Sequence, residues 1–193
     1  MSITLVAGLG NPGRTYVNTR HNLGWVVIDA FARKRGLAWH NEPSFEAMLA
    51  RWDSPAGVRW LAKPLTFMND SGIAVGVIAR FHKLPVADVC AIHDDLNMEL
   101  GRVKVSVTGS AGGHNGVASL LEHLGDGFAR YRLGIGPKEP KEMDMKDFVL
   151  TKFSSEQLVI IDQKLYLYVQ GLELLLESGA DRAMNQINRK EES

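Results

Sequence analysis

An apolar run that ends in a glycine-rich turn is the feature that most constrains the fold. Residues 3–7 are apolar, and Gly8-Leu9-Gly10-Asn11-Pro12-Gly13 follows directly. This pattern predicts a buried strand whose carboxyl end carries a loop. In open α/β sheets, that edge is where ligands bind. His21 lies just before the next helical pattern begins, and an imidazole there can act as a base near neutral pH.

The rest of the chain alternates between strand and helix patterns. A β-hairpin is predicted over 45–62, and strands over 86–92, 103–107 and 131–135. Helices are predicted over 22–35, about 71–82, the segment from 117 to 124, and about 155–178. This order predicts an α/β fold: one domain over 1–193, with a twisted mixed β-sheet and helices on both faces.

Local signals refine these boundaries. Ser154 and Gln157 form a capping box for the last helix, which is expected to end at Gly179. The second helix is expected to bury a stripe of Ile73, Val77 and Phe81. In the last helix the expected inward residues are Leu158, Ile161, Leu165, Tyr168, Leu172 and Leu176. Residues 136–153 are expected to form a long mobile loop, and residues 185–193 a frayed tail.

Composition excludes several classes of protein. The chain of 193 residues has 22 basic and 22 acidic residues, so no strong basic bias indicates nucleic-acid binding. The single cysteine, Cys90, excludes an internal disulfide and a cysteine-rich metal site. No apolar run approaches the length of a membrane span, and no basic-then-apolar signal segment opens the chain. We therefore expect a cytoplasmic protein.

Polar side chains recur in the loops that follow the predicted strands. One expected cleft gathers one histidine, one aspartate and three asparagines: His21, Asp94, Asn11, Asn69 and Asn115. This set suits hydrolysis by activated water, because a histidine base supported by a carboxylate can take a proton from water. Asparagine side chains and the N–H groups of the Gly112-Gly113 turn suit a carbonyl oxygen whose charge grows.

Other interpretations remain open from the residues alone. His21 is also compatible with a capping role, and Asp94 with a simple turn. The first loop matches the G-x-G-x-x-G dinucleotide fingerprint, but Pro12 and the non-periodic residues after it separate the glycines from the helix. Residues 108–112 miss the serine nucleophile motif G-x-S-x-G by one glycine. Four residues have side chains that can bind a metal ion, but their spacing matches no metal-binding motif: His21, His93, Asp94 and His114.

Four long segments in order resemble the signatures of bacterial-type peptidyl-tRNA hydrolases. The first is the glycine turn with Tyr16 and Thr19-Arg20-His21-Asn22, and the second is Lys63-Pro64-Leu65-Thr66-Phe67-Met68-Asn69-Asp70-Ser71-Gly72. The third is His93-Asp94-Asp95-Leu96, and the fourth is Gly109-Ser110-Ala111-Gly112-Gly113-His114-Asn115-Gly116. The resemblance runs from about residue 3 into the last predicted helix.

The resemblance implies an enzyme that cleaves the ester between a peptide and the 3′ ribose of tRNA, which recycles tRNA from stalled translation. It implies no metal or cofactor, no membrane partner and a cytoplasmic monomer whose partner is peptidyl-tRNA. His21 matches the catalytic base, Asp94 its supporting carboxylate, and Asn11 the residue that distinguishes blocked from free amino groups. The expected substrate and tRNA contacts are Tyr16, Phe67, Met68, Asn69, His114 and Asn115, with Lys104, Arg132 and Lys138 as basic contacts.

Departures from the family pattern fall on the basic surface. Basic residues are frequent in the family where Ser106, Val107 and Ala118 stand here, and an aspartate is common in place of Asn97. The family commonly has tyrosine in place of Phe67. We expect weaker and less salt-sensitive tRNA binding than in a more basic relative. The main alternative to the hydrolase is a non-catalytic RNA-binding protein on the same scaffold. A nucleotide-dependent oxidoreductase is a third hypothesis.

Overall fold

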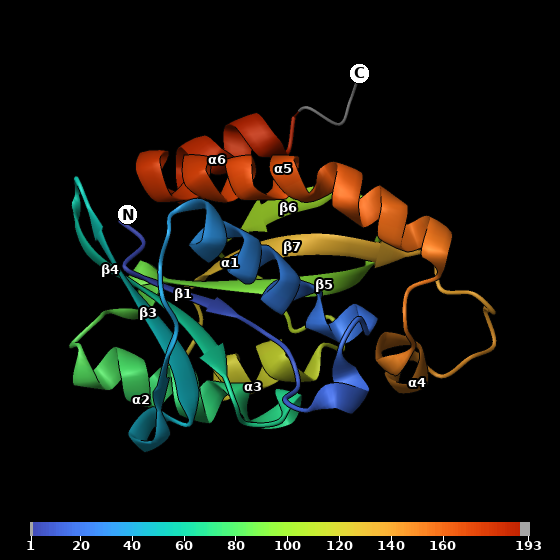
Figure 1. Cartoon of the computed structure of the whole chain (residues 1–193), viewed down its shortest axis with the longest axis horizontal. Helices are drawn as coiled ribbons and strands as arrows, with labels where there is room; N and C mark the ends of the chain where they lie inside the picture. Colours follow the sequence, from blue (N-terminus) through green and yellow to red (C-terminus); the bar gives the residue numbers. More distant parts are fainter. Residues whose placement is uncertain (1, 190–193) are drawn as a thin grey trace.

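A mixed β-sheet with helices on both faces forms the centre of the computed structural model, which describes residues 2–189 (Figure 1). The strands are β1 (Leu5–Gly8), β2 (His40–Glu42), β3 (Ala47–Ser54), β4 (Gly57–Pro64), β5 (Val89–Glu99), β6 (Val103–Ser106) and β7 (Ala129–Gly136). The helices are α1 (Leu23–Lys34), α2 (Ser71–Phe81), α3 (Asn115–Leu124), α4 (Met145–Leu150), α5 (Ser155–Ser178) and α6 (Ala180–Ile187). The predicted α/β class and the mixed sheet are confirmed.

The sheet order is β2-β3-β4-β1-β5-β7-β6. Strand β1 is parallel to both β4 and β5, and β5 is parallel to β7. The segments that follow β1 and β4 therefore leave the sheet at the same edge, as expected. The outer strands β2, β3 and β6 pair antiparallel with their neighbours.

Two apolar layers cover the two faces of the sheet. Helices α1, α5 and α6 pack on one face, where Phe31, Tyr168 and Leu172 are fully buried. Helices α2 and α3 pack on the other, with Val75 and Leu120 in the core. Figure 1 shows α5 and α6 above the sheet and α2 and α3 below it.

Close packing fixes where α1 begins. A Cβ on Gly24 would lie 2.5 Å from the Ile92 carbonyl oxygen and 2.7 Å from that of Leu9. Only glycine allows this approach of helix to sheet, because backbone atoms cannot be displaced as a flexible side chain can. The start of α1, and the residues just before it, are therefore held against the carboxyl end of β1.

The helix faces differ from the expectation at α2. Ile73 and Phe81 are 39% and 67% exposed, whereas Ala74, Val75 and Ile78 face the core. The reason is the tight crossing of α2 over α3, where a Cβ on Gly72 would lie 2.0 Å from the Ser119 oxygen. In α5, the capping box and the end at Gly179 are confirmed, but Leu158 is 38% exposed rather than inward.

Two segments expected to be irregular contain helices. Helix α4 lies inside the predicted loop 136–153, with Phe148 buried and Asp144 capping its first turn. Helix α6 reaches Ile187, and the Asn188 side chain bonds both backbone groups of Val105 at 2.9 Å. The chain is therefore ordered to this point, and the rest of the expected tail, 190–193, lies outside the described residues.

Candidate active site

The segment between β1 and α1 is closed on itself by one asparagine. The Asn22 side chain accepts a hydrogen bond from the Asn11 backbone N–H and donates one to the Asn11 carbonyl, both at 2.9 Å. Both residues are buried. This pair draws the ends of the loop together, so that Asn11 and His21 face the same space. The sequence motif contains Asn22, but only the structure reveals this role.

Asn11 also links the first loop to the second. Its Oδ1 accepts a hydrogen bond of 2.7 Å from the Met68 backbone N–H. Since the amide oxygen is used in this way, the Asn11 amide NH₂ is the group left for a ligand. The two loops after β1 and β4 are thus joined through a residue that lines the cavity.

A histidine–aspartate pair lies at the centre of the site. His21 Nδ1 is 2.9 Å from Asp94 Oδ1 and 3.1 Å from Oδ2. Since an ionised carboxylate only accepts, Nδ1 carries the proton and Nε2 keeps its lone pair. Asp94 lies inside β5 rather than in a loop after it, because β5 continues to Glu99. The strand therefore holds the carboxylate rigidly.

His114 reaches the same carboxylate from the start of α3. Its Nε2 is 3.0 Å from Asp94 Oδ1, and the rings of His21 and His114 have centroids 4.6 Å apart. The loop before α3 was expected to follow a parallel strand, but β6 is antiparallel to β7. Arg130 compensates by donating to the carbonyls of Gly109 and Ser110, which directs this loop back to the cleft.

Burial and charge act in opposite directions on these groups. Burial opposes ionisation of Asp94, but the two imidazoles and their hydrogen bonds hold the pKa of its carboxyl well below the usual range. Burial lowers the pKa of His93 to about 3, although the nearby Asp94 and Asp95 carboxylates act in the opposite direction. His93 is therefore neutral at physiological pH, and Asp94 carries the buried negative charge.

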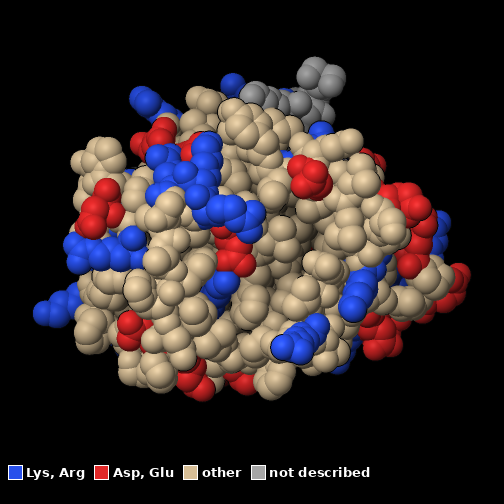
Figure 2. Space-filling model, viewed as in Figure 1, with Lys and Arg blue, Asp and Glu red and all other residues tan. Residues whose placement is uncertain are grey.

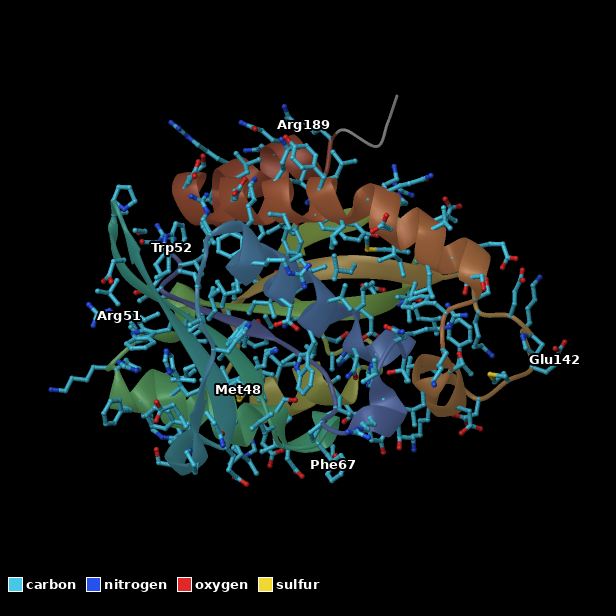
Figure 3. The ribbon with its side chains drawn as sticks, in the orientation of Figure 1. Met48, Arg51, Trp52, Phe67, Glu142 and Arg189 are labelled. Carbon is cyan, nitrogen blue, oxygen red and sulfur yellow. The ribbon has the colours of Figure 1, made fainter. Side chains whose placement is uncertain are left out.

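The residues around the pair enclose a cavity of about 890 Å³. Phe67 is 55% exposed and projects from the loop after β4 (Figure 3). Its ring lies edge-on to that of Tyr16, with centroids 6.3 Å apart. All of the predicted site residues except Lys104 and Lys138 line the cavity: Asn11, Tyr16, His21, Phe67, Met68, Asn69, Asp94, His114, Asn115 and Arg132.

The expected basic contacts have mixed outcomes. Lys104 is not among the residues that line the cavity, although it pairs with Arg132 across β6 and β7. Arg132 lies in the wall and is held by the Asp95 carboxylate at 2.7 Å. Lys138 donates to the carbonyls of Lys141 and Met143 within its own loop. Figure 2 shows that, on the face in view, Lys and Arg side chains form separate patches among uncharged and acidic ones.

One predicted contact, the Met68 side chain, lies deeper than a ligand contact requires. Met68 is 3% exposed, and its sulfur would be 2.5 Å from a Cβ on Gly116, so it packs under the start of α3. Its backbone N–H, rather than its side chain, serves the site through Asn11. Met68 is thus a packing residue that also lines the cavity wall.

Three potential metal donors lie together in the site. One ligand atom from each of His21, Asp94 and His114 falls within 4.8 Å of the others. The donor atoms that face one another are already joined by hydrogen bonds, and one carboxylate is shared by the two imidazoles.

Among residues 2–189, no helix is long and apolar enough to cross a membrane.

Comparisons with known proteins agree with this geometry. The family model described as peptidyl-tRNA hydrolase matches residues 5–193. The peptidyl-tRNA hydrolase of Anaeromyxobacter sp. (strain K) is 44% identical over 187 residues, which are 96% of each chain. That of Symbiobacterium thermophilum is 43% identical and covers 95% of this chain.

Solved structures agree as well. A crystal structure of peptidyl-tRNA hydrolase from Acinetobacter baumannii superposes with a TM-score of 0.89 at 34% identity. The match covers 97% of this chain and 95% of that one. The resemblance seen in the sequence motifs is therefore confirmed.

Proposed function

The chain belongs to the peptidyl-tRNA hydrolase family, and from this premise we propose that it hydrolyses the ester between a peptide and the 3′ ribose of tRNA. One observation supports this most directly. His21 is bonded to Asp94 through Nδ1, and its ring lines a cavity that also exposes the side chains of Asn69 and Asn115. A general base and neutral amide donors around one space suit ester hydrolysis.

In the proposed mechanism, His21 Nε2 takes a proton from a water molecule as its oxygen attacks the ester carbonyl carbon. The Asp94 carboxylate stabilises the imidazolium that forms. The tetrahedral intermediate then collapses, the bond to the ribose 3′ oxygen breaks, and the imidazolium returns its proton to that oxygen. The products are a free peptide carboxylate and tRNA. A positioned base of this kind contributes roughly 10²–10⁴ in rate.

The neutral asparagines suit the charge that develops on the carbonyl oxygen. Asn69 and Asn115 lie in the cavity wall with exposed side chains, and neither side chain makes a hydrogen bond within the described residues. We propose that their amide groups donate to the ester oxygen and the peptide backbone. One such donor, directed at a developing oxyanion, contributes about 3 kcal/mol.

We propose that Asn11 recognises the blocked amino group of the substrate. Its oxygen is fixed by Met68, so its NH₂ group is oriented towards the cavity. This donor fits the carbonyl of the first peptide bond. A free aminoacyl-tRNA lacks that carbonyl and carries a charged amine, which leaves the donor unpaired and disfavours binding.

The aromatic pair of Tyr16 and Phe67 forms the proposed contact for the tRNA 3′ end. Bases stack on exposed aromatic rings with little sequence preference, at about 1–3 kcal/mol per base. Arg132 is the basic side chain in the wall that we propose to meet the tRNA backbone. Lys104 remains a proposed contact outside the cavity.

The function is tested with two substrates and one variant. Wild type should cleave N-acetyl-aminoacyl-tRNA and leave aminoacyl-tRNA intact. His21→Ala should lose cleavage while keeping its unfolding midpoint and its affinity for tRNA. Unchanged turnover in this variant would refute the mechanism. Absence of cleavage by wild type would favour the alternative of an RNA-binding protein without catalysis.

We further propose that the chain is one domain that acts as a cytoplasmic monomer and needs no metal. A chelator should then leave turnover unchanged, and added zinc should not raise it. Light scattering at the enzyme's working concentration should give the mass of one chain, 21.3 kDa. Loss of activity on chelation would contradict this proposal and would indicate a metal ion bound by His21, Asp94 and His114.

A further inference from the structure

His114 is hydrogen-bonded inside the protein at both ring nitrogens. Its Nε2 lies 3.0 Å from Asp94 Oδ1, and its Nδ1 lies 3.2 Å from the Val117 backbone nitrogen. Only 8% of the side chain is exposed. Although the ring lines the cavity, neither nitrogen is available to a ligand. The expected role of His114 as a substrate contact therefore does not fit its surroundings.

The two bonds fix the tautomer of the ring. A backbone N–H can only donate, so Nδ1 of His114 must present its lone pair to Val117. The ring proton is then on Nε2, which donates to Asp94. His114 is thus a neutral donor to the carboxylate and, at the same time, the N-cap of α3.

Asp94 Oδ1 accepts from two imidazoles at once. The distances are 2.9 Å from His21 Nδ1 and 3.0 Å from His114 Nε2. Two donors from different elements hold the carboxylate in one orientation. We propose that His114 is a positioning residue, which fixes the Asp94 carboxylate against His21 and divides its charge between two imidazoles. This inference rests on the proposed function of His21 as the base.

The division of charge has a consequence for the base. A carboxylate that already accepts a second strong donor attracts the His21 imidazolium less. Loss of the His114 bond should therefore favour protonated His21 and extend inactivation by acid to higher pH. Loss of orientation should also slow the proton transfer itself, because catalysis depends on the alignment of the base.

The other titratable groups near His21 cannot take over the effect of the His114 bond on the charge of Asp94. The His93 ring packs against His114 at 4.9 Å between centroids and stays neutral. Asp95 is turned to Arg132, with which it forms an ion pair. Two further charged side chains of the cavity wall, Asp144 and Lys146, come from the start of α4 and have opposite signs.

His114→Asn separates the two roles of the residue. Asparagine is a good N-cap, so it can keep the start of α3, but its side chain is too short to retain the bond to Asp94. The matched control is His123→Asn on the same helix, where the ring bonds the Ser119 carbonyl. Both variants should unfold at nearly the wild-type midpoint.

The kinetic readout is kcat and KM for N-acetyl-aminoacyl-tRNA as a function of pH. His114→Asn should lower kcat on the order of tenfold, comparable to the loss of an outer hydrogen-bond partner of a metal-binding side chain, with little change in KM. The acidic limb of its kcat profile should move to higher pH, whereas His123→Asn should match wild type. An acidic limb that stays in place would overturn the proposal, whatever the value of kcat.

A measurement on the wild-type protein tests the geometry even if the variant folds poorly. Nitrogen NMR of the ¹⁵N-histidine-labelled chain should show His114 with its proton on Nε2 between pH 6 and 8. A proton on Nδ1 would overturn the proposal. This readout does not involve turnover, so its outcome is independent of the test of the enzymatic function by His21→Ala.

Discussion

Each polar side chain at the centre of the site has its hydrogen bonds assigned by its neighbours. Asn22 uses its oxygen and its NH₂ group on the backbone of Asn11, which leaves the Asn11 side chain free to face Met68 and the cavity. Asp94 accepts from two imidazoles. Because these partners come from β5, α3 and the loops after β1 and β4, the site is ordered before any substrate binds.

Buried His93 makes the protein sensitive to acid. In the folded chain its pKa is lowered to about 3 by burial, against 6.5 for the ordinary side chain. Between these values the unfolded chain binds a proton that the folded chain does not. Stability is therefore complete above about pH 6.5 and falls as the pH is lowered towards 3. The carboxyl of Asp94, with its lowered pKa, loses its contribution only below about pH 3.8.

The expected loss is measurable between pH 7 and pH 5. One proton over 1.5 pH units corresponds to about 2 kcal/mol of unfolding free energy. His93→Phe keeps a ring in the core without this titration, so its stability should fall by about 2 kcal/mol less than that of wild type. Urea unfolding at both pH values measures this, and the remaining histidines cancel because both proteins contain them. An equal fall in both proteins would contradict the assignment to His93.

At the residue scale, the sequence identified the catalytic side chains, but it did not identify the hydrogen bonds that hold the surrounding loops in place. His21 and Asp94 were paired from their loop positions and types, and the structure brings them within 2.9 Å. The roles of Asn22 and Arg130 were not predicted, since their hydrogen-bond partners lie 11 and 20 positions away along the chain. A histidine followed by an asparagine before a helix gives no local sign of which backbone group the amide will bind.

At the scale of elements, Arg20 joins the helix α4 region to the segment that carries His21. Its guanidinium donates to Thr151 Oγ1 at 3.0 Å and to Gln157 Oε1 at 2.9 Å. The same group lies over the rings of Phe148 and Phe153, at 4.4 and 4.9 Å from their centroids. Burial lowers the pKa of Arg20, and none of these partners is an acid. Arg20 therefore works through hydrogen bonds and ring contacts rather than through an ion pair.

Arg20→Leu should lower the free energy of unfolding by about 1.5–3 kcal/mol, because hydrogen bonds from a charged group are lost in a buried place. Hydrogen exchange in α4 should increase more than in α2, which Arg20 does not touch. The control is Arg51→Leu on β3, whose exposed pair with Asp53 is worth less than about 1 kcal/mol. Equal effects of the two changes, measured by urea unfolding, would show that the Arg20 contacts contribute little.

Elements with strong local signals were predicted well, and those that depend on packing were not. Gly125 and Gly179 end α3 and α5 as expected, since glycine there takes a positive φ. The prediction of which face of α2 is buried was wrong. The helix is apolar on several sides, so the sequence pattern does not fix its orientation, which follows from the crossing with α3. The short α4 was missed because its six residues owe their stability to Phe148 in the core.

At the scale of the molecule, the topology explains why residues from four distant segments meet. Three of these segments come from β1, β4 and β5, whose parallel order could be predicted from the chain. The fourth, before α3, follows an antiparallel strand and reaches the site through its own length and through Arg130. The predicted residues therefore lie together in one cavity, although one of the reasons given for this does not hold.

The even charge of the molecule bears on tRNA binding. The chain has 22 basic and 22 acidic residues, and Arg132 in the cavity wall is already paired with Asp95. Ser106 also lines the cavity, on β6 next to Arg130 of β7. Each phosphate contact made by a protein steepens the dependence of affinity on salt. A lysine at Ser106 should therefore add one such contact.

Ser106→Lys should strengthen tRNA binding and steepen the slope of log affinity against log salt by about 0.7–0.9. Binding is measured in the His21→Ala background, so that N-acetyl-aminoacyl-tRNA stays intact. Ser178→Lys adds the same charge at the end of α5 that lies away from α4 (Figure 1), and it should leave the slope unchanged. Equal steepening by both would point to net charge rather than to a local contact. No steepening by Ser106→Lys would mean that tRNA phosphates do not reach this wall, because a cation placed beside a phosphate cannot avoid displacing counterions.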